Sequence, residues 1–231
     1  MSCQPDVITL NTILKAFCKA KRVEEAMKIL NDMMIGKFSE PDLVSFTTVI
    51  FAFLKDGKAE AAWNLLHKTM PERRLRPGVV TYNAVIRGLF SLGMAAEAMD
   101  AYTSMASQGV GADCTTYAII LEGLFQVDHV DEGKRFWDDV VWPSGVHDNF
   151  VYAAIIKGLC DAGRFEEACS FLYELVDSGI SPNIVSFNIL INSACKLGLK
   201  REAYQIVGEM RRNGLSPDSI TWRVLEKFYK T

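Results

Sequence analysis

The sequence predicts an all-α protein, a solenoid of helix–turn–helix repeats wound into a right-handed superhelix, and three observations support this. The 231-residue chain aligns with itself at steps of 35 or 36 residues. Within each step, apolar residues recur at helical spacing. Gly and Pro interrupt the pattern at fixed places in each step. The handedness is inferred by analogy with other helical-repeat arrays, not from these residues.

The repeat divides the chain into one array without an internal linker. Five of the seven prolines occupy the same slot of the repeat, so they mark boundaries and do not form a Pro-rich segment. Stacked neighbours bury apolar faces that one helix pair cannot bury alone. Six full repeats are expected at 7–42, 43–78, 79–113, 114–148, 149–183 and 184–218, with partial repeats at 1–6 and 219–231.

Each repeat is expected to begin with an amphipathic helix. In the sixth repeat Phe187, Leu190, Ile191 and Ala194 fall at i, i+3, i+4 and i+7, which is one face of a helix. A glycine then ends the helix, because Gly adopts the left-handed conformation without a Cβ penalty. These glycines are Gly57, Gly93, Gly163 and Gly198, and Lys21 and Asp128 stand at the same place in repeats 1 and 4.

A second helix follows, marked in several repeats by a Glu-Ala pair such as Glu202-Ala203. The small Ala suggests that the two helices approach closely there. Ile206, Val207 and Met210 complete an apolar face, and a Gly and a Pro then end the helix and restart the cycle.

The residue that closes each repeat is nearly always Asp or Asn. Both side chains cap the N-terminus of a helix, so one interpretation is that each caps the following first helix and does nothing more. A second interpretation adds a role in recognition. The closing residues are Asp6, Asp42, Gly78, Asp113, Asp148, Asn183 and Asp218.

A polar stripe runs along the first helix beside its apolar face. It is Asn11, Lys15 and Lys19 in repeat 1, and Asn188 and Lys196 lie on it in repeat 6. Asn is unfavourable inside a helix because its side chain competes for backbone hydrogen bonds. A solvated face would ordinarily use Lys, Glu or Gln, whereas an amide, which both donates and accepts, suits reading a base edge.

These residues resemble the pentatricopeptide repeat family, with plain repeats throughout. The period of 35 residues and the segments "VVTYNAVIRGLF", "AAIIKGLCDAGRFEEA" and "SGISPN" are close to its consensus and keep register over six copies. Tetratricopeptide repeats have a 34-residue period and a Trp/Leu-Gly/Tyr pattern that is absent here.

The resemblance implies binding of single-stranded RNA, one base per repeat. Side chains of the first helix, each with a closing Asp, would read the bases, and an Asn–Asp pair resembles the pair that favours uracil. The implied base-reading residues are Asn11 with Asp42, Thr47, Asn83 with Asp113, and Asn188 with Asp218.

The resemblance also implies two supporting columns. Aliphatic side chains three residues before the reading column would wedge the bases: Ile8, Val44, Val80 and Val185, with Thr115 and Phe150 at this place in repeats 4 and 5. Lysines at the end of the first helix would contact phosphate: Lys19, Lys55 and Lys196.

Four of the six repeats depart from the family pattern. Thr47 faces Gly78, which has no side chain, and Ala118 and Ala153 cannot hydrogen-bond a base. Ser91, Gln126 and Asp161 replace the phosphate lysine. Repeats 2, 4 and 5 should therefore discriminate little, and the expected site is approximately 5′-U-x-U-x-x-U-3′.

Other functions find little support in the sequence. The net charge of −3 does not suggest a generic basic nucleic-acid binder. His67, His129 and His147 lack ligand spacing, and no deaminase, nuclease or phosphate-loop motif occurs, so we expect no metal, no cofactor, no small-molecule substrate and no catalysis. No apolar run is long enough for a membrane span.

Two packing expectations complete the prediction. Cys18, Cys160 and Cys195 share a repeat column with Leu and Phe, which indicates buried thiols and not disulfides. Trp137 and Trp142 are expected to be packing residues and not stacking platforms for bases.

The favoured function is a sequence-specific RNA-binding adaptor in organellar RNA processing, splicing, stability or translation, acting alone or with protein partners. The family suggests a mitochondrion or chloroplast of a plant. The N-terminus carries neither a signal peptide nor a transit segment, so we expect an excised piece or a mature form. The alternative is a protein–protein scaffold whose RNA face has decayed.

Overall fold

The structure is a computed structural model that describes residues 5–229, and these form helices and connecting turns with no strand. The first helix of every predicted repeat begins at the residue where the repeat begins. These first helices are α1 (Val7–Lys19), α3 (Leu43–Lys55), α6 (Val79–Ser91), α8 (Cys114–Gln126), α11 (Asn149–Asp161), α13 (Ile184–Lys196) and α15 (Ser219–Leu225).

The second helices follow after short turns. They are α2 (Val23–Met34), α4 (Ala59–Asn64) with α5 (Met70–Glu72), α7 (Ala95–Ser107), α9 (Val130–Phe136) with α10 (Trp142–Ser144), α12 (Phe165–Asp177) and α14 (Lys200–Arg212). A short 3₁₀ turn, Glu226–Tyr229, follows α15. Of the predicted partial repeats, residues 1–4 and 230–231 lie outside the described part of the chain.

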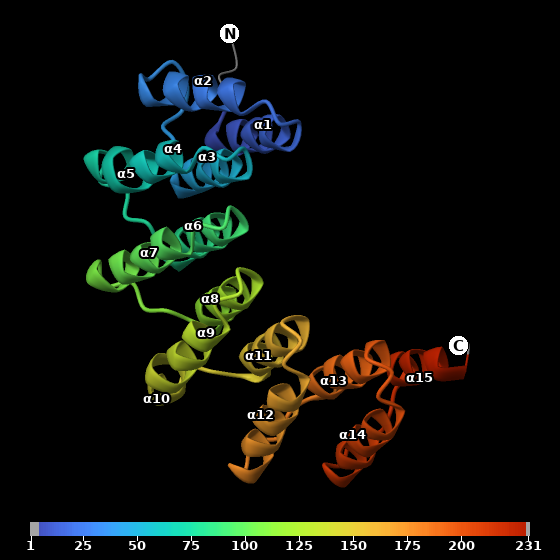
Figure 1. Ribbon diagram of the computed structural model, residues 1–231. Helices are drawn as coiled ribbons and strands as arrows, with labels where there is room; N and C mark the ends of the chain where they lie inside the picture. Colours follow the sequence, from blue (N-terminus) through green and yellow to red (C-terminus); the bar gives the residue numbers. More distant parts are fainter. Residues whose placement is uncertain (1–4, 230–231) are drawn as a thin grey trace. The chain divides into compact units, whose positions relative to one another are not determined.

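The chain forms two compact units, residues 1–112 and 113–231. In the first unit α1, α3 and α6 pack in succession, and α2, α4 and α7 pack on them (Figure 1). In the second unit α8, α11, α13 and α15 pack in succession, and α9, α12 and α14 pack on them. Each unit is a stack of helix pairs, and the single array over residues 1–231 stays a prediction.

The core of each unit lies between its two rows of helices. The predicted face of α13, which is Phe187, Leu190, Ile191 and Ala194, is fully buried. The small residue of the second helix is also buried in every repeat, which confirms that the paired helices approach closely there. These residues are Ala26, Ala62, Ala98, Gly133, Ala168 and Ala203.

The turn inside each repeat uses the left-handed backbone conformation, as predicted. The four glycines at this place have φ between 73° and 76°. Lys21 and Asp128 adopt the same conformation with φ of 57° and 65°. A non-glycine residue is disfavoured in this region. The repeat therefore imposes the turn on whatever residue stands there.

Two of the second helices contain a π-helical turn, which the sequence analysis did not predict. The turns are Leu65–Thr69 and Trp137–Val141, and each lies just before a proline, Pro71 or Pro143. A proline inside a helix lacks the N–H and its ring clashes with the carbonyl four residues earlier. A local shift to longer hydrogen bonds lets the helix continue past it.

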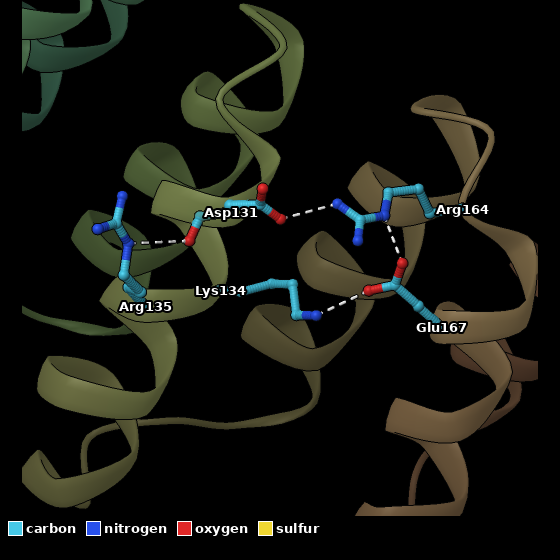
Figure 2. A network of polar contacts seen from close by, with 5 residues as sticks. All are labelled: Asp131, Lys134, Arg135, Arg164 and Glu167. Carbon is cyan, nitrogen blue, oxygen red and sulfur yellow. Dashed lines mark hydrogen bonds and ion pairs between the residues drawn. The ribbon is translucent and has the colours of Figure 1, made fainter.

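An ion-pair network joins α9 to α12 within the second unit (Figure 2). Arg164 contacts both Asp131, at 2.9 Å, and Glu167, and Lys134 Nζ lies 2.7 Å from Glu167. In the first unit Lys58 and Glu24 occupy the same repeat places as Arg164 and Asp131, and they pair at 2.5 Å. Such half-exposed pairs each contribute little to the free energy of folding.

The packing expectations for cysteine and tryptophan hold in part. Cys18, Cys160 and Cys195 are free thiols but only half-buried, so full burial was wrong. The smaller Cys leaves more of its surface open than Leu54 or Phe90, which are buried in the same column. Trp137 is buried, and Trp142, although 42% exposed, packs against the rings of Trp137 at 5.7 Å and His147 at 5.0 Å, so both tryptophans make packing contacts.

No helix in the described part of the chain is both long enough and apolar enough to cross a bilayer. Within residues 5–229, no three His, Cys, Asp or Glu side chains are grouped so that they could hold a metal ion.

Candidate RNA-binding interface

The reading residue of repeat 1 and the closing residue of the same repeat are in contact. The Asn11 side chain donates through Nδ2 to Asp42 Oδ1 at 3.0 Å. The two residues are 31 positions apart, and they meet because α1 packs against α3, whose N-terminus Asp42 caps. This contact, expected from the repeat pattern, shows that Asp42 does more than cap its helix.

The same carboxylate oxygen caps α3. Asp42 Oδ1 accepts the backbone N–H of Ser45 at 2.9 Å, and Ser45 Oγ accepts the backbone N–H of Asp42 at 3.2 Å. Burial acts to raise the pKa of the Asp42 carboxyl, but hydrogen bonds from the Ser45 N–H, Asn11 and the Ser45 hydroxyl outweigh it and lower that pKa below the ordinary value. Asp42 is therefore an ionised, acceptor-only group at neutral pH.

Repeat 6 has the same arrangement in the second unit. Asn188 Nδ2 donates to Asp218 Oδ1 at 3.3 Å, and Asp218 caps α15 through the backbone N–H of Thr221 at 2.8 Å. Hydrogen bonds from the Thr221 N–H and hydroxyl lower the pKa of Asp218. Two repeats of different units thus hold an amide beside a carboxylate in one geometry.

A hydroxyl that the sequence analysis overlooked completes each arrangement. Ser45 Oγ donates to Asn11 Oδ1 at 2.6 Å, and Thr221 Oγ1 donates to Asn188 Oδ1 at 2.7 Å. Both hydroxyl residues are fully buried. The signal was available, since the third residue of the first helix is Thr or Ser in six repeats: Thr9, Ser45, Thr81, Thr116, Ser186 and Thr221.

The third predicted pair divides between the two units. Asn83 is a buried residue of α6 in the first unit, and Asp113 caps α8 in the second unit by accepting the Thr116 N–H at 2.7 Å. Their pairing stays a prediction.

Repeat 2 lacks a carboxylate, as the sequence indicated. Gly78 occupies the N-cap position before α6 and makes no side-chain capping hydrogen bond. The Thr47 hydroxyl instead shares a hydrogen bond of 2.9 Å with the Thr81 hydroxyl. Thr47 therefore has a polar neighbour, but no ionised group fixes which of the two hydroxyls donates.

Repeats 4 and 5 carry alanine at the reading place. Ala118 is fully buried and Ala153 is half-buried. Their closing residues act as helix caps: Asp148 accepts the backbone N–H groups of Phe150 and Val151, and Asn183 accepts those of Val185 and Ser186. Capping thus persists where the reading side chain has been lost.

The column expected to wedge bases is exposed in every repeat. Its side chains show between 45% and 72% of their surface, which is unusual for aliphatic residues and leaves them free to contact a ligand. The members are Ile8, Val44, Val80 and Val185.

The three predicted phosphate lysines are exposed at the C-terminal ends of their helices. Lys19 ends α1, Lys55 ends α3 and Lys196 ends α13. Lys55 Nζ lies 4.6 Å from the centre of the Phe51 ring, which restrains its side chain by a cation–π contact. At the same place Ser91, Gln126 and Asp161 are also exposed.

Stacked helix pairs that repeat every 35 or 36 residues define the class of helical-repeat solenoids. The PPR repeat family matches residues 41–90, 77–126, 147–196 and 182–227, and the PPR repeat matches residues 1–34. These matches cover most of the chain, which therefore belongs to the pentatricopeptide repeat family. A search of curated proteins found no match.

Solved structures agree with this assignment. The pentatricopeptide repeat protein PPR10 from maize is 25% identical, with a TM-score of 0.78 over 96% of this chain and 32% of that chain. PPR10 in complex with an 18-nt psaJ RNA element is 21% identical, with a TM-score of 0.60 over 99% of this chain and 38% of that chain.

A third structure, nuclear proteinaceous RNase P 2 from A. thaliana, is 13% identical, with a TM-score of 0.56 over 80% of this chain and 42% of that chain. This likeness concerns the fold alone. The chain spans about a third of the length of maize PPR10.

Proposed function

We propose that this chain binds single-stranded RNA and reads one base with each competent repeat. The observation that carries the proposal is the Asn–Asp pair, which has the same geometry in repeats 1 and 6. Each pair uses one of the two amide protons and one of the two carboxylate oxygens, and we infer that the other proton and oxygen face the base. A donor next to an acceptor suits recognition of a base edge.

The surroundings of each pair support the same function. In repeats 1 and 6 an exposed aliphatic side chain, Ile8 or Val185, precedes the reading residue, and an exposed lysine, Lys19 or Lys196, ends the helix. An apolar platform, a polar reader and a cation together match the three parts of a nucleotide. The similarity to PPR10, a protein crystallised with an RNA element, gives further support.

The predicted site follows from the side chains that each repeat presents. Repeats 1, 3 and 6 carry Asn with Asp, which favours uracil in the family, whereas repeats 2, 4 and 5 discriminate weakly. The chain should therefore prefer RNAs that contain 5′-U-x-U-x-x-U-3′.

The chain acts as a binding module and not as an enzyme. By occupying a transcript, or by recruiting protein partners to it, it would affect processing, splicing, stability or translation. The family relationship supports a role in a mitochondrion or chloroplast.

A protein–protein scaffold is the second candidate, and the middle repeats favour it. Ala118 and Ala153 offer no hydrogen bond, and the exposed Asp161 repels phosphate. If the scaffold role were the true one, the Asn–Asp pairs would serve only to hold neighbouring repeats together.

Competition binding separates the two functions. A labelled RNA with the spaced uracils is displaced by the same unlabelled RNA and by an oligomer of A of equal length. We expect the spaced-uracil RNA to compete at least tenfold better, on the order of one specific base contact. Equal competition, or no binding to either RNA, would exclude sequence reading and favour the scaffold.

A further inference from the structure

In three of the first helices, the third residue places a hydroxyl beside the reading residue of the preceding repeat. This hydroxyl is buried at Ser45, Thr81 and Thr221. In each case it hydrogen-bonds a reading side chain 33 or 34 residues earlier in the sequence. The contact therefore recurs between neighbouring repeats in both units of the chain.

The contact fixes which way the amide of the reading Asn faces. Asp42 is ionised and only accepts hydrogen bonds, so the Asn11 Nδ2 must face it. Asn11 Oδ1 then faces Ser45. Ser45 Oγ lies 2.6 Å from Asn11 Oδ1 and 3.0 Å from Asp42 Oδ1. Because Asp42 Oδ1 already accepts two N–H groups and the contact with Asn11 is the shorter one, we assign the hydroxyl proton mainly to Asn11 Oδ1.

The repeats that lack a reading amide provide an internal comparison. Where the reading residue is Ala153, the corresponding Ser186 hydroxyl is buried and has no hydrogen-bond partner among the described residues. Where it is Ala118, Val151 replaces the hydroxyl residue altogether. In repeat 5 the Asn183 N–H donates to Asn149 and not to Ser186. The natural partner of this hydroxyl is therefore the reading side chain, beyond any capping role.

We propose that Ser45 and Thr221 are positioning residues for base recognition, an inference that rests on the RNA-binding function proposed above. Each hydroxyl occupies the amide oxygen of its Asn and leaves the second Nδ2 proton for the base. The reading side chain then acts as a donor beside the free oxygen of the Asp. Adjacent O4 and N3–H groups of uracil complement this pair.

Removing the hydroxyl frees the amide oxygen as an acceptor and releases one of the two contacts that hold the side chain. An acceptor can take the exocyclic amino group of cytosine. Loss of the hydroxyl should therefore relax the choice of base without abolishing RNA binding.

The test compares full-length Thr221→Val with Thr221→Ser, since only the first removes the hydroxyl. Competition binding uses two RNAs that differ by U or C at the base read by repeat 6. We expect Thr221→Val to lower the preference for U roughly two- to tenfold, as for the loss of one neutral hydrogen bond. Thr221→Ser should keep the wild-type preference.

Ser186→Ala is the matched control, because that hydroxyl occupies the same place but faces Ala153. It should leave the preference at the repeat 6 base unchanged and should not lower the thermal midpoint. Ser45→Ala, read out at the base of repeat 1, provides an independent variant if Thr221→Val does not fold. An unchanged U-to-C ratio in hydroxyl-deleted proteins that still bind RNA overturns the proposal.

A measurement without RNA distinguishes failure of this inference from failure of the proposed function. The side-chain amide protons of Asn188 should exchange with solvent more slowly in the wild type than in Thr221→Val, as measured by NMR. Slow exchange without RNA binding would reject the proposed function but retain the positioning contact. Equal exchange in both proteins would reject the positioning contact itself.

Discussion

One oxygen of Asp218 accepts hydrogen bonds both from its own helix and from the amide of the preceding repeat. It accepts the Thr221 N–H at 2.8 Å and Asn188 Nδ2 at 3.3 Å. Capping and pairing are therefore not alternatives, as the sequence had left them. A single substitution can still separate them, because Asn caps a helix about as well as Asp but also donates hydrogen bonds.

We predict that Asp218→Asn shifts the base preferred by repeat 6 from U toward C. The new amide no longer requires the Asn188 nitrogen to face it, and an Asn–Asn pair leans toward cytosine in the family. The change in relative affinity should be roughly five- to tenfold, near the low end for a base-edge contact. Competition binding with RNAs that differ only at that base measures it.

The thermal midpoint is the control for this substitution, and it should stay close to the wild-type value. If both proteins rank U and C alike at equal stability, Asp218 is only a cap.

Because hydrogen bonds lower the pKa of Asp218, its carboxylate stays ionised as the pH falls from 8 to 5. The wild-type preference for U should therefore be constant over that range, and protonation can abolish it only below the ordinary Asp value, near pH 4.

The environment of Asn11 differs from what the polar stripe suggested. A stripe beside an apolar face implies a solvated side chain, yet Asn11 is only 7% exposed. The Asp42 and Ser45 side chains of the next repeat cover it. A buried amide held by one donated and one accepted hydrogen bond has a defined orientation, which is what selective recognition requires.

At the scale of the helix, close packing between neighbouring first helices depends on glycine. An added Cβ at Gly158 in α11 would overlap the ring of Phe125 in α8, and one at Gly88 in α6 would lie 2.6 Å from Leu54 in α3. Phe125 and Leu54 are buried, so they cannot move aside into solvent. Glycine is required here for packing, although it is a poor helix former.

We predict that Gly158→Ala lowers the stability of the chain, although alanine is the better helix former. Overpacking a filled core costs about 1–3 kcal/mol, and the gain in helix propensity offsets up to about 1 kcal/mol of it. Thermal unfolding followed by circular dichroism should show a lower midpoint.

Gly208→Ala in α14 is the matched control, because the nearest atom to an added Cβ there is Arg212 Nη2 at 4.0 Å. This substitution should raise stability by up to about 1 kcal/mol. A Gly158→Ala protein as stable as the wild type would mean that α8 and α11 can separate without loss.

At the scale of the whole molecule, the acidic balance of the chain conceals a local arrangement of positive charge. The net charge is −3, but Lys19, Lys55 and Lys196 all lie at the ends of first helices. Arg164 and Lys134 are occupied by ion pairs between second helices (Figure 2). We therefore expect position in the repeat, and not total charge, to decide which cations contact RNA.

Replacing Lys19, Lys55 and Lys196 together with alanine should flatten the salt dependence of RNA binding. Each phosphate neutralised on a single strand contributes roughly −0.7 to the slope of log affinity against log salt, so the slope should change by about two units. Affinities measured at salt concentrations between roughly 50 and 300 mM give the slope. An unchanged slope would show that other cations contact the phosphates.

The sequence by itself determined the periodic features of this protein. The starts of the first helices, the turn at Gly198 and its equivalents, and the apolar faces all follow from spacing, because a stacked repeat places equivalent residues in equivalent surroundings. Even the left-handed turns at Lys21 and Asp128 could be located by register alone. The contact of Asn188 with Asp218 was likewise predictable, since both positions recur in every repeat.

Only the tertiary structure decided how individual side chains share their hydrogen bonds. In the sequence, Ser45 and Thr221 are ordinary helix-start residues. Their hydroxyls contact the reading amides only because α3 and α15 pack against the preceding first helices. The π-helical turns before Pro71 and Pro143 depend on a helix continuing past a proline because packing holds it in place. Repetition fixes where a residue stands, but its partner belongs to a neighbouring repeat, and only packing brings the two within hydrogen-bond distance.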